Sequence, residues 1–276
     1  MERLEAARAV AAARSTVSAL EMRADDAVVL HNSNRLTVRL LPADVVAQVA
    51  PVAHQVAAFE VELAQRLHEA GCPVAALDPR VELRVHERDG FVITLWTYHA
   101  SVSSAGVPPA AYAEALARLH AGMREVGVPA PHWTERLDRA RRLVASPVDT
   151  PELGDADREL LAVTLRDRGG AVSGSGGREQ LLHGEPHPNN VLSTAGGLLF
   201  VDLETCCRGP VEFDLAHAPA GVGERYPGVD LDVLRASRTL VLAINTTWRW
   251  ERGDQLPDGR RLAEEWLGQI RAAGGR

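Results

Sequence analysis

Residues 182–192 read LHGEPHPNNVL, and residues 199–204, after a short turn-forming segment, read LFVDLE. The first stretch places Glu185 two residues after His183 and Asn190 five residues after Glu185. Asp202 follows the apolar run of the second stretch, at the end of an expected strand. Side-chain oxygens of asparagine and aspartate suit Mg²⁺, and no cysteine or histidine cluster in the sequence competes for a softer metal.

The four residues have the spacing of a kinase pattern, H-x-D-x-x-x-x-N followed by the aspartate of D-F-G. Phosphoryl transfer needs a carboxylate near the attacking hydroxyl, and it needs oxygen ligands that hold Mg²⁺ against the triphosphate. The spacing therefore predicts Glu185 as the catalytic base and Asn190 and Asp202 as the metal ligands. His183 is expected to brace the loop by hydrogen bonding.

The composition excludes several other chemistries. All thirty basic residues are arginines, because the chain contains no lysine. This excludes a Walker A phosphate loop, a pyridoxal phosphate Schiff base and any lysine nucleophile. The formal net charge of −7 argues against a nucleic-acid or membrane-surface partner. With no signal peptide, no apolar run near the ~18 residues of a membrane span and only three cysteines, the expected location is the cytoplasm.

Apolar periodicity divides the chain into a β-rich first part and a mainly helical second part. Strands are expected at residues 28–31, 36–41, 45–49, 81–85 and 91–97. Helices are expected at residues 2–21, 55–70, 108–122, 133–145, 155–166, 231–252 and 260–272. A β-rich segment at 180–202 interrupts the helices. The sequence thus predicts an α+β protein with a five-stranded antiparallel sheet, crossed by the 55–70 helix, and a helical part joined to it near residues 97–108.

Three motifs together resemble the aminoglycoside phosphotransferase family, which consists of small-molecule kinases with a protein-kinase-like fold. Residues 183–190 match the family motif H-G-D-x-H-P-x-N, Val201-Asp202-Leu203 match its strand-Asp motif, and residues 209–216 match G-P-x-x-x-D-L-A. Residues 115–121, ALARLHA, resemble the helix before the catalytic loop of that family. The resemblance implies a bilobal fold. A β-rich lobe at 1–98 would bind the nucleotide, and a helical lobe at 99–276 would carry the catalytic loop and the acceptor site.

The chain departs from the family at two positions. Glu185 stands where the family has its aspartate base, and the longer side chain displaces the carboxylate unless the backbone adjusts. Gln48 stands where the third strand of kinases carries a phosphate-binding lysine. A neutral amide can hydrogen-bond a phosphate but brings no charge. Arg35 or Arg39 on the preceding strand is therefore expected to supply the cation.

Further candidate nucleotide-binding residues lie in the same lobe. Glu60 lies at the edge of the apolar stripe of the expected 55–70 helix, three residues before Leu63. It is the inward carboxylate that would pair with the phosphate-binding group. The turn at residues 31–34 lacks the usual glycines, so phosphate contacts are expected from backbone N–H groups and from Asn32 and Ser33. Asp214 is expected to support the catalytic loop.

The resemblance implies an ATP- or GTP-dependent, Mg²⁺-requiring phosphotransferase that acts on a hydroxyl of an antibiotic, a sugar, an amino alcohol or a natural-product intermediate. An aminoglycoside is not favoured, because residues 203–276 carry eleven carboxylates and ten arginines and so offer a polycation no acidic excess. Two alternatives stay open. One is a nucleotide-binding pseudokinase with a regulatory role, motivated by Glu185 and Gln48. The other is a biosynthetic enzyme whose acceptor is a carrier or a peptide.

Overall fold

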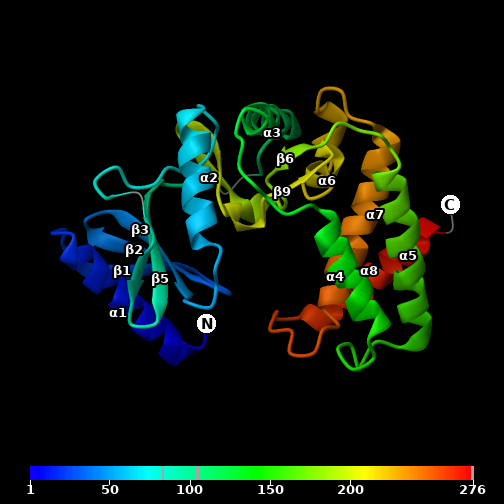
Figure 1. The fold of residues 1–276 in the computed structure, drawn as a ribbon, viewed down its shortest axis with the longest axis horizontal. Helices are drawn as coiled ribbons and strands as arrows, with labels where there is room; N and C mark the ends of the chain where they lie inside the picture. The colour runs from blue at the N-terminus through cyan, green and yellow to red at the C-terminus, as the bar shows by residue number, and fades with distance from the viewer. Residues whose placement is uncertain (83, 103–105, 275–276) are drawn as a thin grey trace. The chain divides into compact units, whose positions relative to one another are not determined.

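The computed structural model describes residues 1–82, 84–102 and 106–274 (Figure 1). Its contacts group the chain into two compact units, and each unit is built from segments that are distant in sequence. Unit 1 comprises Met1–Val107, Ala121–Val128 and Asn189–Thr205. Unit 2 comprises Pro108–His120, Pro129–Pro188 and Cys206–Arg276. The motif around residues 182–204 is therefore divided, with its first half in unit 2 and its second half in unit 1.

Unit 1 is built on a five-stranded antiparallel sheet with the strand order β1-β2-β3-β5-β4 (Figure 1). The strands are β1 (Ala24–Asn32), β2 (Leu36–Pro42), β3 (Val45–Pro51), β4 (His86–Arg88) and β5 (Phe91–Thr97). In the register, Val49 of β3 lies opposite Leu36 of β2 and opposite Ile93 of β5. The prediction of an α+β protein with an N-terminal antiparallel sheet is confirmed.

Two helices, α1 (Arg3–Ala19) and α2 (Ala57–Glu69), cover opposite faces of this sheet (Figure 1). Successive side chains of a strand point to opposite faces, so β3 shows which helix covers which face. Val49 packs into a core that includes the small alanines of α1. Gln48, its neighbour, lines a small pocket with Glu60 of α2. The face that carries the candidate nucleotide-binding residues is thus the face under α2.

The fourth strand lies later in the chain than predicted. A strand was expected at residues 81–85, whereas β4 begins at His86, and residue 83 lies outside the described residues. The Val81 N–H donates to the Asp78 carbonyl at 3.2 Å, and the Asp78 carboxylate accepts from the Arg80 backbone N–H at 2.9 Å. This turn, with Pro79 at its second position, overrides the apolar alternation of residues 81–85, because turn chemistry fixes the backbone locally.

A small hairpin carries the second half of the motif within unit 1. It consists of β7 (Val191–Thr194) and β8 (Gly197–Phe200), and it lies between the short 3₁₀ helices η1 (Pro188–Asn190) and η2 (Leu203–Thr205). Phe200 attaches the hairpin to the rest of the unit: its N–H donates to the Pro73 carbonyl at 2.8 Å, and its carbonyl accepts from Ala75 at 3.0 Å. This places Asp202 close to α2, although the two are about 140 residues apart in the chain.

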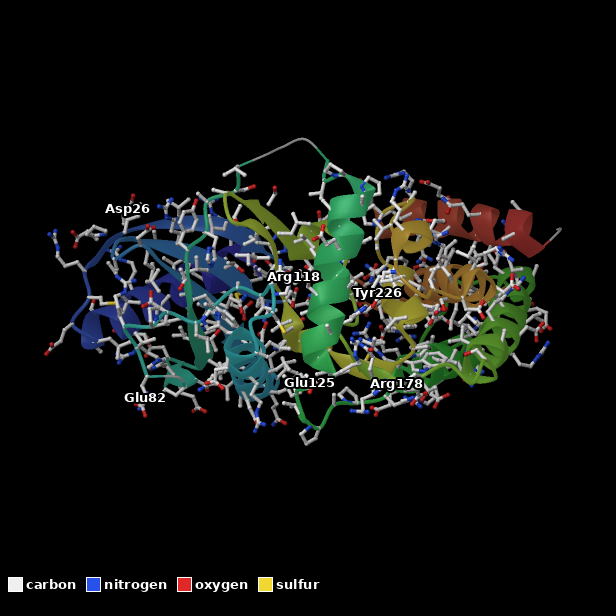
Figure 2. All side chains as sticks on the ribbon, turned by 90° about the horizontal axis from the view of Figure 1, so that it is seen from above. Asp26, Glu82, Arg118, Glu125, Arg178 and Tyr226 are labelled. Carbon is white, nitrogen blue, oxygen red and sulfur yellow. The ribbon has the colours of Figure 1, made fainter. Side chains whose placement is uncertain are left out.

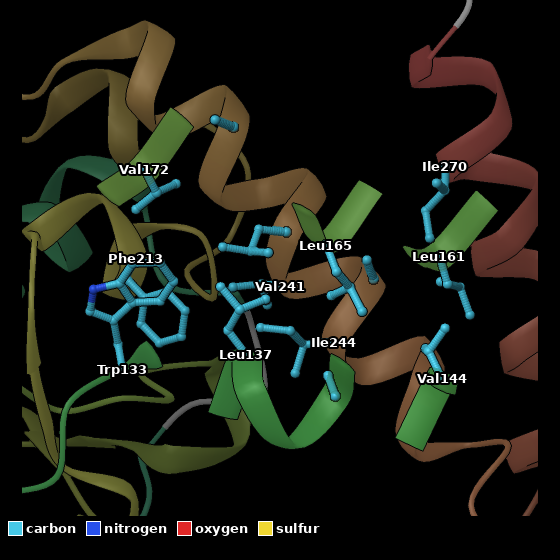
Figure 3. Close-up of a cluster of buried hydrophobic side chains, with 14 of the residues drawn as sticks. Trp133, Leu137, Val144, Leu161, Leu165, Val172, Phe213, Val241, Ile244 and Ile270 are labelled. Atoms are coloured by element: carbon cyan, nitrogen blue, oxygen red, sulfur yellow. The ribbon is translucent and has the colours of Figure 1, made fainter. Parts of the chain in front are cut away.

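Unit 2 is mainly helical. Its longer helices are α3 (Pro109–Met123, up to His120 in this unit), α4 (Thr134–Ala145), α5 (Asp155–Ser173), α7 (Leu231–Trp248) and α8 (Gly259–Gly274). Helix α6 (Val211–Leu215) is short, and β6 (Gln180–Leu182) pairs antiparallel with β9 (Cys207–Gly209). Figure 3 shows the core of the unit, where Trp133 packs against Phe213, and Leu137, Leu165 and Ile244 interdigitate. Within the described residues, every helix is too short or too polar to cross a lipid bilayer.

Helix α5 is longer than its sequence predicts. The expected end was Arg166, before the pair Gly169-Gly170, but the helix continues to Ser173. Gly169 faces α4: a Cβ atom built on it would lie 2.6 Å from Cδ2 of Leu137. The glycine therefore permits close packing of α4 and α5, and this contact offsets the intrinsic helix-breaking tendency of glycine.

Candidate active site

Arg35 lies at the centre of a cluster of ion pairs in unit 1. Its Nη1 and Nη2 donate to the two carboxylate oxygens of Glu60 at 2.6 and 3.3 Å. Nη2 also donates to Oδ1 of Asp202 at 2.5 Å, and Nη1 lies 3.5 Å from Oε2 of Glu204. Arg35 and Glu60 are 8% and 1% exposed. A bidentate arginine–carboxylate pair of this kind combines charge with a fixed orientation.

Three separate segments bring these side chains together. Arg35 immediately precedes β2, Glu60 lies in the first turn of α2, and Asp202 follows β8. Glu60 also accepts a hydrogen bond from the backbone N–H of Leu203 at 3.1 Å, which links α2 directly to the segment after β8. Burial by itself would lower the pKa of Arg35, but the carboxylates of Glu60 and Asp202 outweigh it and hold that pKa above its ordinary value. Arg35 is therefore a permanent cation.

Asp202 and Asn190 flank the open end of the β7–β8 hairpin. The backbone N–H of Val201 donates to the carbonyl of Asn190 at 3.0 Å. Because Asp202 directly follows Val201, this hydrogen bond brings the backbones of the two candidate metal ligands close together. Asp202 has φ = 67°, in the left-handed region that few side chains other than asparagine and aspartate adopt. Such backbone strain is common at functional sites, because it sets the direction of a side chain.

The donors at this position fit Mg²⁺. Asp202 offers a carboxylate whose side chain is 32% exposed, and Asn190 offers an amide oxygen from a buried residue. Among the described residues, no three or more His, Cys, Asp or Glu side chains form a group that could hold a metal ion. Mg²⁺ needs only one or two protein carboxylates, because it keeps waters and takes phosphate oxygens of the nucleotide. The residues fit an ion that arrives with the nucleotide.

The structure distinguishes the two arginines that the sequence left open. Gln48 lines a small pocket together with Arg35 and Glu60, and its Oε1 is buried without a hydrogen-bond partner in the described part of the chain. Arg39 lies farther along β2, opposite Val46. Its Nε donates to Oδ1 of Asp44 at 2.7 Å, and its guanidinium lies 3.5 Å from the ring centroid of Tyr98. The partner of Glu60 is therefore Arg35.

Asn32 and Ser33 lie at the exposed turn between β1 and β2. The Asn32 Oδ1 accepts a hydrogen bond from the amino group of Met1 at 2.9 Å, and the Ser33 carbonyl accepts from the same group at 2.6 Å. The Ser33 N–H donates to the carbonyl of Arg35 at 3.0 Å. The turn leads directly into Arg35, and its role in binding phosphate stays a prediction.

Unit 2 holds the first half of the motif around a single buried carboxylate. Asp214 accepts from the backbone N–H groups of His183 at 2.8 Å and Gly184 at 2.7 Å, and from Nε2 of His120 at 2.9 Å. Gly184 has φ = 90°, a conformation that requires glycine. Burial raises the pKa of Asp214, but the hydrogen bond from His120, the nearby charges of His120 and His183 and the Gly184 N–H together outweigh it and keep that pKa below its ordinary value. The ionised carboxylate of Asp214 therefore fixes the loop.

Glu185, the candidate base, projects from this fixed loop. Its Oε1 accepts from Nη1 of Arg136 at 3.2 Å, and the same nitrogen donates to the Gly184 carbonyl at 3.1 Å. The Tyr112 hydroxyl donates to the carbonyl of Pro186 at 2.6 Å. The Glu185 side chain remains 23% exposed, so it can still accept a proton from a bound molecule.

Several of these supporting residues were not predicted as functional. The sequence gives no sign that Arg136 contacts the loop at residues 183–188, yet its Nη1 donates to the Gly184 carbonyl. His120 belongs to the ALARLHA stretch, and its Nδ1 lies 2.8 Å from the hydroxyl of Tyr226, which Figure 2 shows beside α3. Glu204 belongs to the stretch at residues 199–204, but the sequence pattern assigned it no role. No local pattern marks these residues, because their partners are distant in sequence.

A five-stranded sheet with a buried helix carboxylate paired to a cation, and a helical unit with an H-G-x-x-H-P loop, define a protein-kinase-like small-molecule kinase fold. The model of the phosphotransferase enzyme family, APH, matches residues 23–254, which is most of the chain. The chain belongs to this family. None of the curated proteins compared with it is similar in sequence.

Solved structures share the fold at low sequence identity. Aminoglycoside 2'-phosphotransferase-IIIa in its GDP complex is 15% identical, with a TM-score of 0.71 over 99% of this chain and 100% of that one. Choline kinase LicA from Streptococcus pneumoniae is 13% identical, with a TM-score of 0.68 over 95% and 97%. Amicoumacin kinase hAmiN, in complex with AMP-PNP, Ca²⁺ and Ami, is 11% identical, with a TM-score of 0.69 over 89% and 88%. These likenesses confirm the kinase-like fold.

Proposed function

We propose that this protein transfers the γ-phosphoryl group of ATP or GTP to a hydroxyl group of a small molecule. In this proposal residues 1–98 bind the nucleotide, and residues 99–276 carry the catalytic loop and the acceptor site. Asn190 and Asp202 would hold Mg²⁺, which when bound neutralises charge on the phosphates. Complexes of similar solved structures contain AMP-PNP with Ca²⁺, or GDP, which supports a nucleotide and a divalent cation as ligands.

The observation that carries the proposal is the chain of contacts from Glu60 through Arg35 to Asp202. Kinases need a cation that is fixed by a helix carboxylate and binds the nucleotide phosphates. This chain has no lysine, yet it places a buried, permanently charged guanidinium on that carboxylate. Gln48 at the lysine position lines the same pocket and keeps an unused hydrogen-bonding atom there.

In the proposed reaction Glu185 accepts the proton of the acceptor hydroxyl while the hydroxyl oxygen forms a bond to the γ-phosphorus. The bond from that phosphorus to the bridging oxygen breaks, and the nucleoside diphosphate leaves with the electron pair. Two residues hold the loop that presents Glu185. Arg136 donates to the Glu185 side chain, and Asp214 accepts from backbone N–H groups of the loop. Asn32, Ser33, Gln48 and Arg39 remain proposed nucleotide contacts, and the cytoplasm remains the proposed location.

The acceptor is proposed to be a neutral or weakly charged alcohol. The candidate base already has an arginine partner, Arg136, at 3.2 Å, which disfavours a polycation at that carboxylate. Similar solved structures include a choline kinase, an amicoumacin kinase and an aminoglycoside phosphotransferase, so the fold itself does not select one acceptor.

A screen of hydroxyl-bearing acceptors with ATP or GTP and Mg²⁺, read out as release of the nucleoside diphosphate, tests the proposal. Transfer to at least one acceptor is expected, and Asp202→Ala should abolish it while the circular dichroism spectrum is retained. Because Glu185 and Gln48 depart from the family pattern, the competing function is a pseudokinase. Tight binding of Mg²⁺–nucleotide without transfer to any acceptor would establish the pseudokinase and contradict the proposal.

A further inference from the structure

Arg35 differs from a lysine in a way that matters for the metal. An ammonium group is a compact point charge, whereas the planar guanidinium presents several donors in a fixed fork. Arg35 uses both terminal nitrogens for Glu60 and also donates from Nη2 to Asp202. One side chain therefore occupies the helix carboxylate and the proposed metal ligand at the same time.

Asp202 is the carboxylate that Arg35 can release most easily. The Glu60 side chain is only 2% exposed, and it accepts both Arg35 nitrogens as well as the Leu203 N–H. The Glu204 side chain is 19% exposed, and the Asp202 side chain is 32% exposed. Water can replace the lost partner of an accessible carboxylate, whereas a buried one would be left unpaired.

The charges in the cluster favour joint binding of metal and phosphate. One guanidinium faces three carboxylates within 3.5 Å, and Nε2 of His54 lies 3.6 Å from the Glu204 carboxylate, so acidic groups outnumber the arginine in this cluster. A divalent cation that bound Asp202 alone would have to displace Nη2 and lie beside a buried cation, which costs Coulomb energy. Nucleotide phosphates change this balance, because they give the displaced N–H groups new charged acceptors.

We propose that Arg35 guards the metal-binding carboxylate. Without nucleotide it occupies Asp202 and weakens the binding of a divalent cation alone. When nucleotide binds, Arg35 transfers its Nη2 donor from Asp202 to a phosphate oxygen, and Asp202 becomes available to the metal. Mg²⁺ and nucleotide thus raise each other's affinity through one side chain, and the coupling is reciprocal. This inference rests on the nucleotide site of the proposed function but not on phosphoryl transfer.

Isothermal titration of the full chain with Mg²⁺ alone tests the proposal. Arg35→Gln removes the resident cation and should tighten the binding of Mg²⁺ alone at least about tenfold. Arg35→Lys keeps a positive charge but cannot span Glu60 and Asp202, so it should tighten Mg²⁺ binding by a smaller factor. Arg66→Gln is the matched control, because Arg66 forms an exposed ion pair with Glu62 on the same helix. It should bind Mg²⁺ like the parent.

A second titration measures Mg²⁺ binding with saturating ADP, which permits no transfer. The parent should bind Mg²⁺ at least about tenfold more tightly with ADP than without it, and Arg35→Gln should lose most of that difference. Equal binding of Mg²⁺ alone to the parent, Arg35→Gln and Arg35→Lys would overturn the proposal. If Arg35→Gln does not fold, Arg35→Lys decides the question. If the acceptor screen finds no transfer, the two titrations still test the role of Arg35. If the protein transfers phosphate but its variants bind Mg²⁺ like the parent, this inference is refuted and the proposed function is not.

Discussion

Asp202 in unit 1 and Asp214 in unit 2 are both hydrogen-bonded carboxylates, but their partners differ in kind. Asp214 is completely buried and accepts from two backbone N–H groups and from His120. Asp202 is a third exposed, and its arginine partner is shared with Glu60 and Glu204. A buried carboxylate satisfied by the backbone N–H groups of a distant loop fixes a structure, whereas an accessible carboxylate with a shared partner can exchange that partner for a ligand. The comparison separates a carboxylate that supports the fold from one that is free to exchange its partner for a ligand.

The largest effect is expected at Glu185, which resembles Asp202 in being accessible and arginine-paired. Glu185→Gln keeps the size of the side chain but removes the proton acceptor, so turnover should fall by about 10²–10⁴-fold. The affinity for nucleotide should stay unchanged, as measured by titration with a nucleotide analogue. Glu185→Asp tests whether the loop is built around the longer side chain. A Glu185→Gln variant that turns over at the parent rate would show that Glu185 is not the base.

The next effect concerns stability and should appear at Asp214. Asparagine offers one acceptor oxygen instead of two, and its NH₂ group would face a backbone N–H, so Asp214→Asn should destabilise unit 2 by about 3 kcal/mol. Urea unfolding followed by tryptophan fluorescence measures this, because four of the five tryptophans lie in unit 2. The control is Asp138→Asn, at an exposed pair with Arg141. Equal urea midpoints for Asp214→Asn and Asp138→Asn would show that Asp214 does not stabilise the unit more than an exposed carboxylate does.

The pH dependence of this contribution has a definite sign. The pKa of Asp214 is lowered in the folded protein, so its stabilisation is present above the ordinary pKa of an aspartate. It is lost as the pH falls through the lower, folded value. Asp214→Asn should therefore flatten the acid limb of the stability curve, and a variant with the parent's acid limb would contradict this assignment.

The smallest effect is expected at His217, which follows α6 in unit 2. Burial lowers its pKa to about 3, and repulsion from Arg136 adds to the shift. The folded protein then binds one proton fewer than the unfolded chain between about pH 3 and 6.5, so stability declines as the pH falls through that range. His217→Gln should reduce this decline, as measured by urea midpoints between pH 4 and 7. Identical slopes for parent and variant would mean that His217 titrates normally.

The motif residues could be predicted from the sequence because their geometry is local. Asn190 and Asp202 flank one short hairpin, and the spacing of the pattern already brings the two backbones together. The antiparallel sheet followed from alternating apolar residues and turns. The prediction of a strand at 81–85 was wrong, because a turn at Asp78 and Arg80 determines the backbone there and the apolar pattern does not.

The choice between Arg35 and Arg39 could not be made from the sequence. Arg35 immediately precedes β2 and Arg39 lies within it, four residues apart, so the two-residue period assigns both to the same side and the pattern treats them alike. The decision depends on where α2 crosses the sheet, and it crosses at the end that carries Gln48, Ala50 and Val92. That position is set by packing between distant segments. The contact of Arg136 could not be predicted for the same reason, because its partner, the loop that carries Gly184, lies almost fifty residues away.

The most direct test of the account is the affinity for a nonhydrolysable ATP analogue with Mg²⁺, measured in Arg35→Gln and in the double variant that adds Gln48→Lys. The central claim is that Arg35 supplies the cation for which kinases use a strand lysine. Arg35→Gln should lose at least about tenfold in affinity, because a charged hydrogen bond to phosphate is removed. Gln48→Lys should restore most of it, because Gln48 lines the same pocket beside Glu60. Arg35→Gln with the parent's affinity, or a double variant that binds no better than Arg35→Gln, would contradict the claim.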